Sequence, residues 1–66
     1  MTWEYRVMNR GGELAIYEVY YGDNGTVEGY SSDPTYPAAA TMDALRENCR
    51  QYLASLEKPV IPYEEK

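Results

Sequence analysis

The sequence predicts an α+β fold, a three-stranded antiparallel β-meander with one C-terminal α-helix packed on one face. Three observations lead to it: two strand-like runs rich in aromatic residues, glycine-containing turns after each of them, and one amphipathic stretch in the second half. A chain of 66 residues has room for a single domain. We expect that domain to span residues 1–62 and the remainder, 63–66, to be a frayed tail.

Three segments have strand character. Trp3 to Met8 alternates between apolar and polar residues, as a half-buried strand does. Glu13 to Tyr21 is rich in aromatic and branched residues, and Thr26 to Ser32 is a weaker third strand. The turns between them contain Gly11 and Gly12 in the first case and the pair Asn24-Gly25 in the second, which favours a type I′ hairpin turn.

The helix is predicted from its cap and its apolar spacing. Thr41 is a good N-cap, and Asp43 lies in the first turn, where the helix dipole favours an anion. Pro59 ends the helix one or two residues before it, because the residue preceding a proline is excluded from the α region. Val60 and Ile61 are then expected to be extended and to pack back on the domain. The apolar positions of the helix are Met42, Leu45, Cys49, Tyr52, Leu53 and Leu56.

The register of the strands assigns side chains to two sheet faces. A first turn at Asn9 to Gly12 places Met8 opposite Glu13, and both candidate second turns give the same parity. One face then carries Trp3, Tyr5, Val7, Leu14, Ile16, Glu18, Tyr20, Val27 and Gly29. The other carries Met8, Ala15, Tyr17, Val19, Tyr21 and Tyr30, with Glu4, Arg6 and Glu28 among them. A single helix covers only one face, and we expect it to cover the first.

The face left over is the predicted functional surface. The chain has eight tyrosines, and tyrosine is enriched where proteins meet. We therefore expect an interaction module that binds another protein or a second copy of itself, with a homo-oligomer as the expected state. The alternative is an ordinary amphipathic surface, since tyrosine tolerates water. The predicted interface residues are Met8, Tyr17, Val19, Tyr21 and Tyr30.

Net charge limits the classes of partner. The chain has 11 acidic and 6 basic residues, a formal charge of −5, and its basic residues are scattered. This balance opposes binding to nucleic acid, because no Lys/Arg stripe is present to displace counterions. The alternative function is that of an acidic inhibitor or nucleic-acid mimic that binds a basic protein. Its contact residues would be Glu4, Glu13, Asp23 and Glu28.

The residues of chemical interest do not form a catalytic site. The sequence has no His and one Cys, so His-based nucleophile pairs, an internal disulfide and a metal cluster are excluded. Cys49 lies on the apolar side of the helix, where a buried structural thiol is expected. Glu18 lies on the covered face, where burial could raise its pKa, but pairing with Arg46 or a hydroxyl such as that of Ser31 is the simpler interpretation. We expect no enzyme activity, no cofactor and no metal.

The expected location is the cytoplasm. The N-terminus does not resemble a signal peptide, and no apolar run approaches the roughly 20 residues that cross a bilayer. We therefore expect no membrane partner.

Several segments together resemble a family of small uncharacterised bacterial proteins. They are Trp3-Glu4-Tyr5-Arg6-Val7, Glu18-Val19-Tyr20-Tyr21 and Lys58-Pro59-Val60-Ile61. That resemblance implies no activity. A looser, architectural resemblance is to the partial ribonuclease-H-like fold of HicB-type antitoxins, in which a three-stranded sheet precedes a helix opened by Thr. Here Thr41-Met42-Asp43-Ala44 is one residue shorter than the helix start of those antitoxins, and no DNA-binding segment follows.

Overall fold

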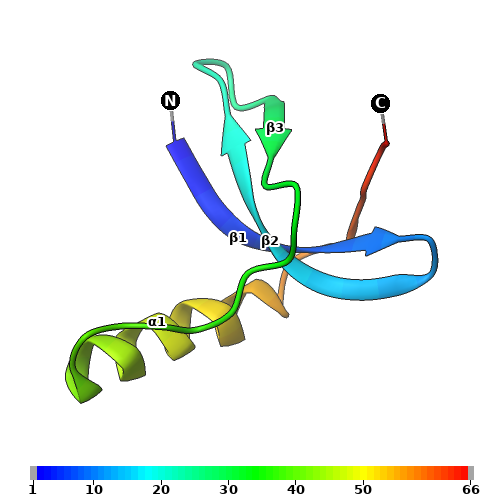
Figure 1. The fold of residues 1–66 in the computed structure, drawn as a ribbon. Coiled ribbons are helices and arrows are strands. Elements are labelled where there is room, and N and C mark those ends of the chain that lie inside the picture. Colours follow the sequence, from blue (N-terminus) through cyan, green and yellow to red (C-terminus); the bar gives the residue numbers. More distant parts are fainter. Residues whose placement is uncertain (1, 66) are drawn as a thin grey trace.

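The protein is described by a computed structural model covering residues 2–65. Its elements are β1 (Thr2–Arg10), β2 (Glu13–Tyr21), β3 (Val27–Tyr30), α1 (Met42–Ser55) and β4 (Ile61–Pro62). The sheet has the order β3-β2-β1-β4 and is strongly curled (Figure 1). The predicted α+β class is confirmed. The sheet differs from the expected meander because β4 adds a fourth strand, parallel to β1.

The β1-β2 hairpin closes on two residues rather than the expected four. Gly11 and Gly12 both have positive φ, 62° and 92°, which a type I′ turn requires and glycine permits. The pairing Arg10↔Glu13 follows, and Val7 lies opposite Ile16. The predicted register is therefore wrong by two residues. A shift of two preserves the side-chain alternation, so the predicted faces of β1 and β2 are unchanged. In β3 the prediction is wrong for Val27, because an irregularity between Tyr20 and Tyr21 pairs Val27 with Tyr21.

The two faces are covered by different parts of the chain. We call the face that carries Tyr5 and Val7 the helix face, because α1 lies against β1 there. We call residues 61–65 the C-terminal segment. The face that carries Met8, Tyr17 and Val19 is the tail face, because the C-terminal segment packs on it. Figure 1 shows the C-terminal segment and α1 reaching different parts of the curled sheet.

The hydrophobic core lies under the tail face. Met8, Tyr17 and Val19 are 0%, 1% and 0% exposed, the lowest values among the apolar residues described. Around them pack half-buried side chains of the sheet and of the C-terminal segment: Ala15, Tyr21, Tyr30, Ile61 and Tyr63. The expectation that this face is uncovered is therefore wrong, because residues 61–63 cover it.

Tyr63 packs on the tail face through both its backbone and its ring. Its backbone N–H donates to the carbonyl of Asn9 at 2.9 Å, which continues the β1-β4 pairing by one residue. Its ring centroid lies 4.6 Å from that of Tyr30 and 5.2 Å from that of Tyr17. The frayed tail predicted at 63–66 is thus wrong at Tyr63, while Lys66 lies outside the described residues. The prediction failed because an isolated aromatic residue after Pro62 gives no periodic signal.

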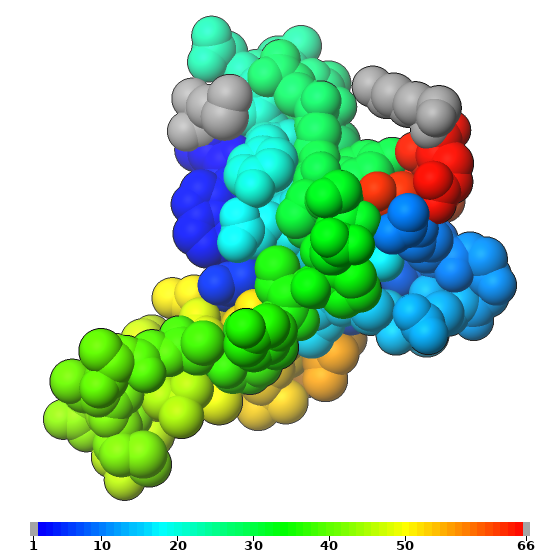
Figure 2. Space-filling model, viewed as in Figure 1, coloured from blue at the N-terminus to red at the C-terminus, as the bar shows by residue number. Residues whose placement is uncertain are grey.

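α1 begins where the sequence predicts and contacts the sheet through its C-terminal half. The Thr41 hydroxyl accepts a hydrogen bond from the N–H of Ala44 at 3.1 Å, which caps the helix. The Tyr52 ring stacks on that of Tyr5 at 4.2 Å, and Asn48 Nδ2 donates to the Tyr5 hydroxyl at 3.2 Å. The N-terminal half of α1 projects beyond the sheet with the loop before it (Figures 1 and 2).

Candidate interaction surface

The five residues predicted to form an interface lie inside the molecule. Met8, Tyr17 and Val19 are fully buried, and Tyr21 and Tyr30 are half-buried beside them. Burial by the chain itself removes the reason for expecting a partner at this face, since a side chain already shielded from water gains little from a second cover. Exposed large apolar side chains remain along α1 and, outside it, at Trp3, Leu14, Val27, Tyr36 and Val60. Those of α1 follow one side of a single element.

Most of the apolar side of α1 faces solvent. Met42, Leu53 and Leu56 are 62%, 64% and 58% exposed. Cys49 is also exposed and Leu45 is half-buried. The sequence predicts all six apolar helix positions to be covered by the sheet. Only Tyr52 is buried and Leu45 is half-buried, so the prediction is wrong for the other four. We call the uncovered set the α1 stripe: Met42, Leu45, Cys49, Leu53 and Leu56.

The cause is the rotation of α1 about its own axis. Tyr52 and Ser55 are the buried residues of α1, and half-buried Asn48 bonds both Tyr5 and the loop N–H of Ala38. Successive helix residues are about 100° apart, which places the centre of the α1 stripe about a quarter turn from this packed side. The helix has one broad apolar side, and the sheet contacts only the edge of that side, at Tyr52.

The charges of α1 are paired within the helix. Arg46 Nη1 lies 3.0 Å from Asp43 Oδ1, and Arg50 Nη1 lies 2.9 Å from Glu47 Oε2, both at i,i+3 spacing. Two acidic and two basic residues make α1 neutral in a chain with a net charge of −5. The α1 stripe is therefore bordered by charges without being an acidic surface.

The molecule exposes more surface than a compact monomer of its size. Its accessible area is 4806 Å² for a mass of 7.6 kDa, whereas a monomer of that mass exposes roughly 4300 Å². Its radius of gyration is 12.4 Å, against roughly 11 Å expected for 66 residues. Both excesses agree with the projecting helix, whose lobe stands apart from the body in Figure 2.

A polar network fixes the exit of α1 to β1. Lys58 Nζ donates to Glu4 Oε1, and the Tyr21 hydroxyl donates to Glu4 Oε2 at 2.6 Å. Arg6 donates to the Tyr21 hydroxyl at 3.0 Å and to the Pro59 carbonyl at 2.7 Å. The hydrogen bond from Lys58, followed by that from Tyr21, lowers the pKa of Glu4. Glu4, one of the acidic residues proposed for a basic partner, is thus already engaged.

The two residues considered for chemistry are also accounted for. Glu18 Oε1 accepts a hydrogen bond from the Tyr20 hydroxyl at 2.8 Å, which raises the pKa of Tyr20. The Ser31 hydroxyl, predicted as a partner of the Glu18 carboxylate, instead accepts from the Glu18 backbone N–H at 3.2 Å. Cys49 is exposed rather than buried. Glu18 and Cys49 lie on different elements, β2 and α1.

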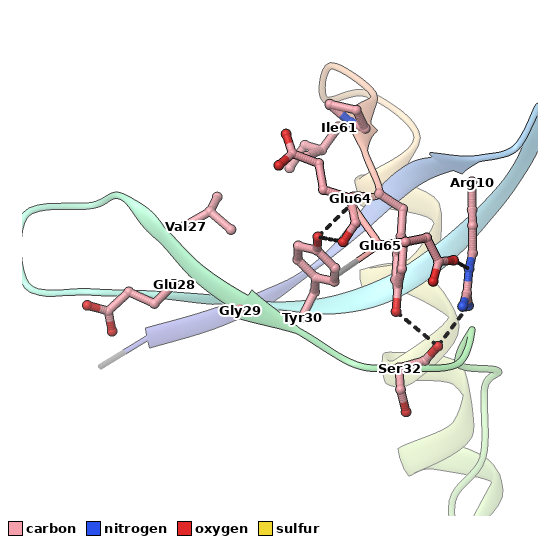
Figure 3. Close-up of a pocket in the computed structure, with 11 residues that line it drawn as sticks. Arg10, Val27, Glu28, Gly29, Tyr30, Ser32, Ile61, Glu64 and Glu65 are labelled. Atoms are coloured by element: carbon pink, nitrogen blue, oxygen red, sulfur yellow. Dashed lines mark hydrogen bonds and ion pairs between the residues drawn. The ribbon is translucent and has the colours of Figure 1, made fainter.

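A hollow of about 700 Å³ lies between β3 and the C-terminal segment (Figure 3). Two of the polar residues that line it, Arg10 and Tyr30, form hydrogen bonds with the surrounding chain. Arg10 Nε lies 2.6 Å from Glu65 Oε1, and Arg10 Nη1 donates to the Ser32 carbonyl at 2.9 Å. The Tyr30 hydroxyl donates to the Glu64 carbonyl at 2.8 Å and accepts from the Glu64 N–H at 2.9 Å. These bonds close the C-terminal segment onto the sheet.

Comparison with known proteins does not identify a relative of this chain. No family model, curated protein or solved structure matches the chain. Among residues 2–65, no three His, Cys, Asp or Glu side chains are grouped to hold a metal ion. Within the same range, no helix is long and apolar enough to cross a membrane. The resemblances drawn from the sequence therefore stay predictions.

Apolar spacing identifies the residues of the α1 stripe in the sequence but does not distinguish an exposed side of the helix from a buried one. The signal that could have separated the two is the width of the apolar side, since Leu53 lies about 100° from Tyr52 on the helix. When the sheet covers only one edge of this 14-residue helix, the Tyr52 side chain is buried and the Leu53 side chain is left in solvent.

Proposed function

We propose that this protein is a small non-catalytic interaction module that associates with a protein partner through the α1 stripe. The observation that carries the proposal is the exposure of Met42, Leu53 and Leu56 on a helix that is otherwise well capped and ordered by the sheet. Soluble monomers rarely expose large contiguous apolar patches, and those that do use them as interaction sites.

The position of the α1 stripe supports the proposal. Met42 and Leu45 lie on the half of α1 that projects beyond the sheet, and Leu53 and Leu56 are exposed at its other end. A partner can therefore reach the α1 stripe without displacing the core under the tail face. The C-terminal segment and the network around Glu4 hold the remainder of the fold in place. A rigid scaffold that presents one uncovered helix loses little conformational entropy on binding, which favours affinity.

Site-specific photo-crosslinking in the organism that encodes the chain tests the proposal. A benzophenone amino acid replaces Leu53 in one variant and the exposed neighbour Ala54, on another side of α1, in the control. We expect a defined covalent product at position 53, and its loss when Leu56→Glu is added. Equal products at both positions, or none at position 53, would contradict the proposed interface. The mass of the product separates a second copy from a different protein.

A further inference from the structure

We propose that the partner of the α1 stripe is a second copy of the same chain, with the two α1 helices antiparallel and Cys49 at the twofold axis. This inference rests on the proposed function and specifies the partner. Its starting point is the spacing of the α1 stripe along the helix.

The spacing reads the same in both directions. Met42 and Leu56 each lie seven residues from Cys49, and Leu45 and Leu53 each lie four residues from it. In an antiparallel pair centred at Cys49, Met42 therefore meets Leu56 of the other copy and Leu45 meets Leu53. Steps of 3, 4, 4 and 3 residues average 3.5, the repeat at which two helices keep contact along a left-handed crossing. The matched seam is about 21 Å long at 1.5 Å per residue.

The direction of pairing follows from where the sheet lies. Tyr5 contacts Asn48 and Tyr52, so the sheet covers the C-terminal half of α1 and leaves its N-terminal half projecting (Figure 1). In an antiparallel pair the two sheets lie at opposite ends of the seam. In a parallel pair they would compete for the same end. Antiparallel packing also places each helix terminus beside the opposite dipole of its neighbour.

Charge and area point to a second copy rather than to another occupant. Two chains of net charge −5 repel each other, but α1 is neutral because Arg46 and Arg50 are paired with Asp43 and Glu47. It is therefore a surface on which two acidic copies can approach. The excess accessible area of roughly 500 Å² per chain is below the roughly 800 Å² per partner of a standard interface, but for two copies it reaches the roughly 1,000 Å² of a small specific one. At the centre, Cys49 is small enough for close approach of the two helices.

Sedimentation equilibrium of the purified chain, from about 1 µM to about 1 mM, gives the first test. We expect a reversible dimer for the natural chain. Leu53→Glu should weaken association by more than about tenfold, because each dimer contains two Leu45–Leu53 contacts. Ala54→Glu adds the same charge outside the seam and should leave association nearly unchanged. Circular dichroism on both variants confirms that they remain folded.

Oxidation of the only thiol gives the second test, on geometry. Diamide accepts two electrons and two protons as the thiols of two chains form one S–S bond. We expect rapid conversion of the natural chain to a disulfide-linked dimer through Cys49. The control, Cys49→Ala with Ala54→Cys, places the same thiol about 140° away around α1 and should react only at the slow rate of random collisions.

Two outcomes would overturn the inference. One is a dimer that ignores Leu53→Glu, or that crosslinks equally from position 54. The other is a strict monomer at every concentration. If the chain is monomeric and position 53 still gives a crosslink to a different protein in the host, the second copy is excluded while the proposed interaction module stands.

Discussion

At the scale of single residues, burial in this chain depends on which segment arrives to cover each face. Met8 and Met42 illustrate the difference. Met8 is 0% exposed between β2 and the C-terminal segment, whereas Met42 begins α1 in solvent. Both occupy apolar positions of a periodic element, yet periodicity predicts Met42 to be covered and Met8 to be uncovered, the reverse of what the structure shows. Their contributions to stability should differ because only Met8 leaves a cavity when shortened.

Met8→Ala should therefore lower the free energy of unfolding by about 2 to 4 kcal/mol, a large share of the stability of so small a domain. Met42→Ala is the matched control and should change it by less than about 0.5 kcal/mol. Urea unfolding at a dilute concentration, where the chain is monomeric, measures both. If only Met8→Ala lost its cooperative unfolding transition, that result would also show that Met8 is a core residue. Equal effects of the two changes would show that residues 61–63 do not cover the tail face.

At the scale of elements, the strands and the helix were largely predictable and their packing was not. Alternation in β1 and β2 assigns the faces correctly even though the turn is shorter than expected, because a shift of two residues keeps the parity. The Thr41 cap identifies the start of α1. The rotation of α1 depends on Tyr52 stacking with Tyr5, a tertiary contact that periodicity does not contain. The burial of the predicted interface residues has a different cause, the packing of Ile61 and Tyr63 over Met8, Tyr17 and Val19.

The network that joins the exit of α1 to β1 predicts a pH dependence. Because the pKa of Glu4 is lowered in the folded state, its contribution to stability is present above the unfolded pKa and is lost as pH falls through the folded value. Glu4→Gln should lower stability at about pH 7 by about 1 kcal/mol or less, since Glu4 is partly exposed. The difference from the natural chain should vanish near pH 2.

Urea unfolding at both pH values measures this effect. Glu57→Gln is the control, because Glu57 is an exposed acidic residue close to the same helix end. Its effect on stability should be small at both pH values. A Glu4→Gln penalty that stayed constant from neutral to acid pH would indicate lost packing rather than a lost charged contact.

At the scale of the whole molecule, one short sheet is covered on one side by residues 61–63 and on the other only at its margin by α1. The α+β class follows from the order of the periodic segments. The identity of the uncovered surface does not, because it depends on a two-residue strand and Tyr63, segments too short to give a pattern. The result is an acidic chain whose largest exposed apolar residues include three on a neutral helix.

This distribution of charge predicts how self-association responds to salt. Two copies of net charge −5 repel each other, and raising NaCl from about 0.05 M to about 0.5 M screens that repulsion. An apolar seam between neutral helices should therefore bind equally well or a few-fold more tightly at high salt. Leu53→Glu places added carboxylates in the seam, so its residual association should gain more from salt than that of Ala54→Glu. Sedimentation at the two salt concentrations measures both effects. A tenfold weakening of the natural dimer at high salt would mean that ionic contacts, and not the α1 stripe, hold the copies together.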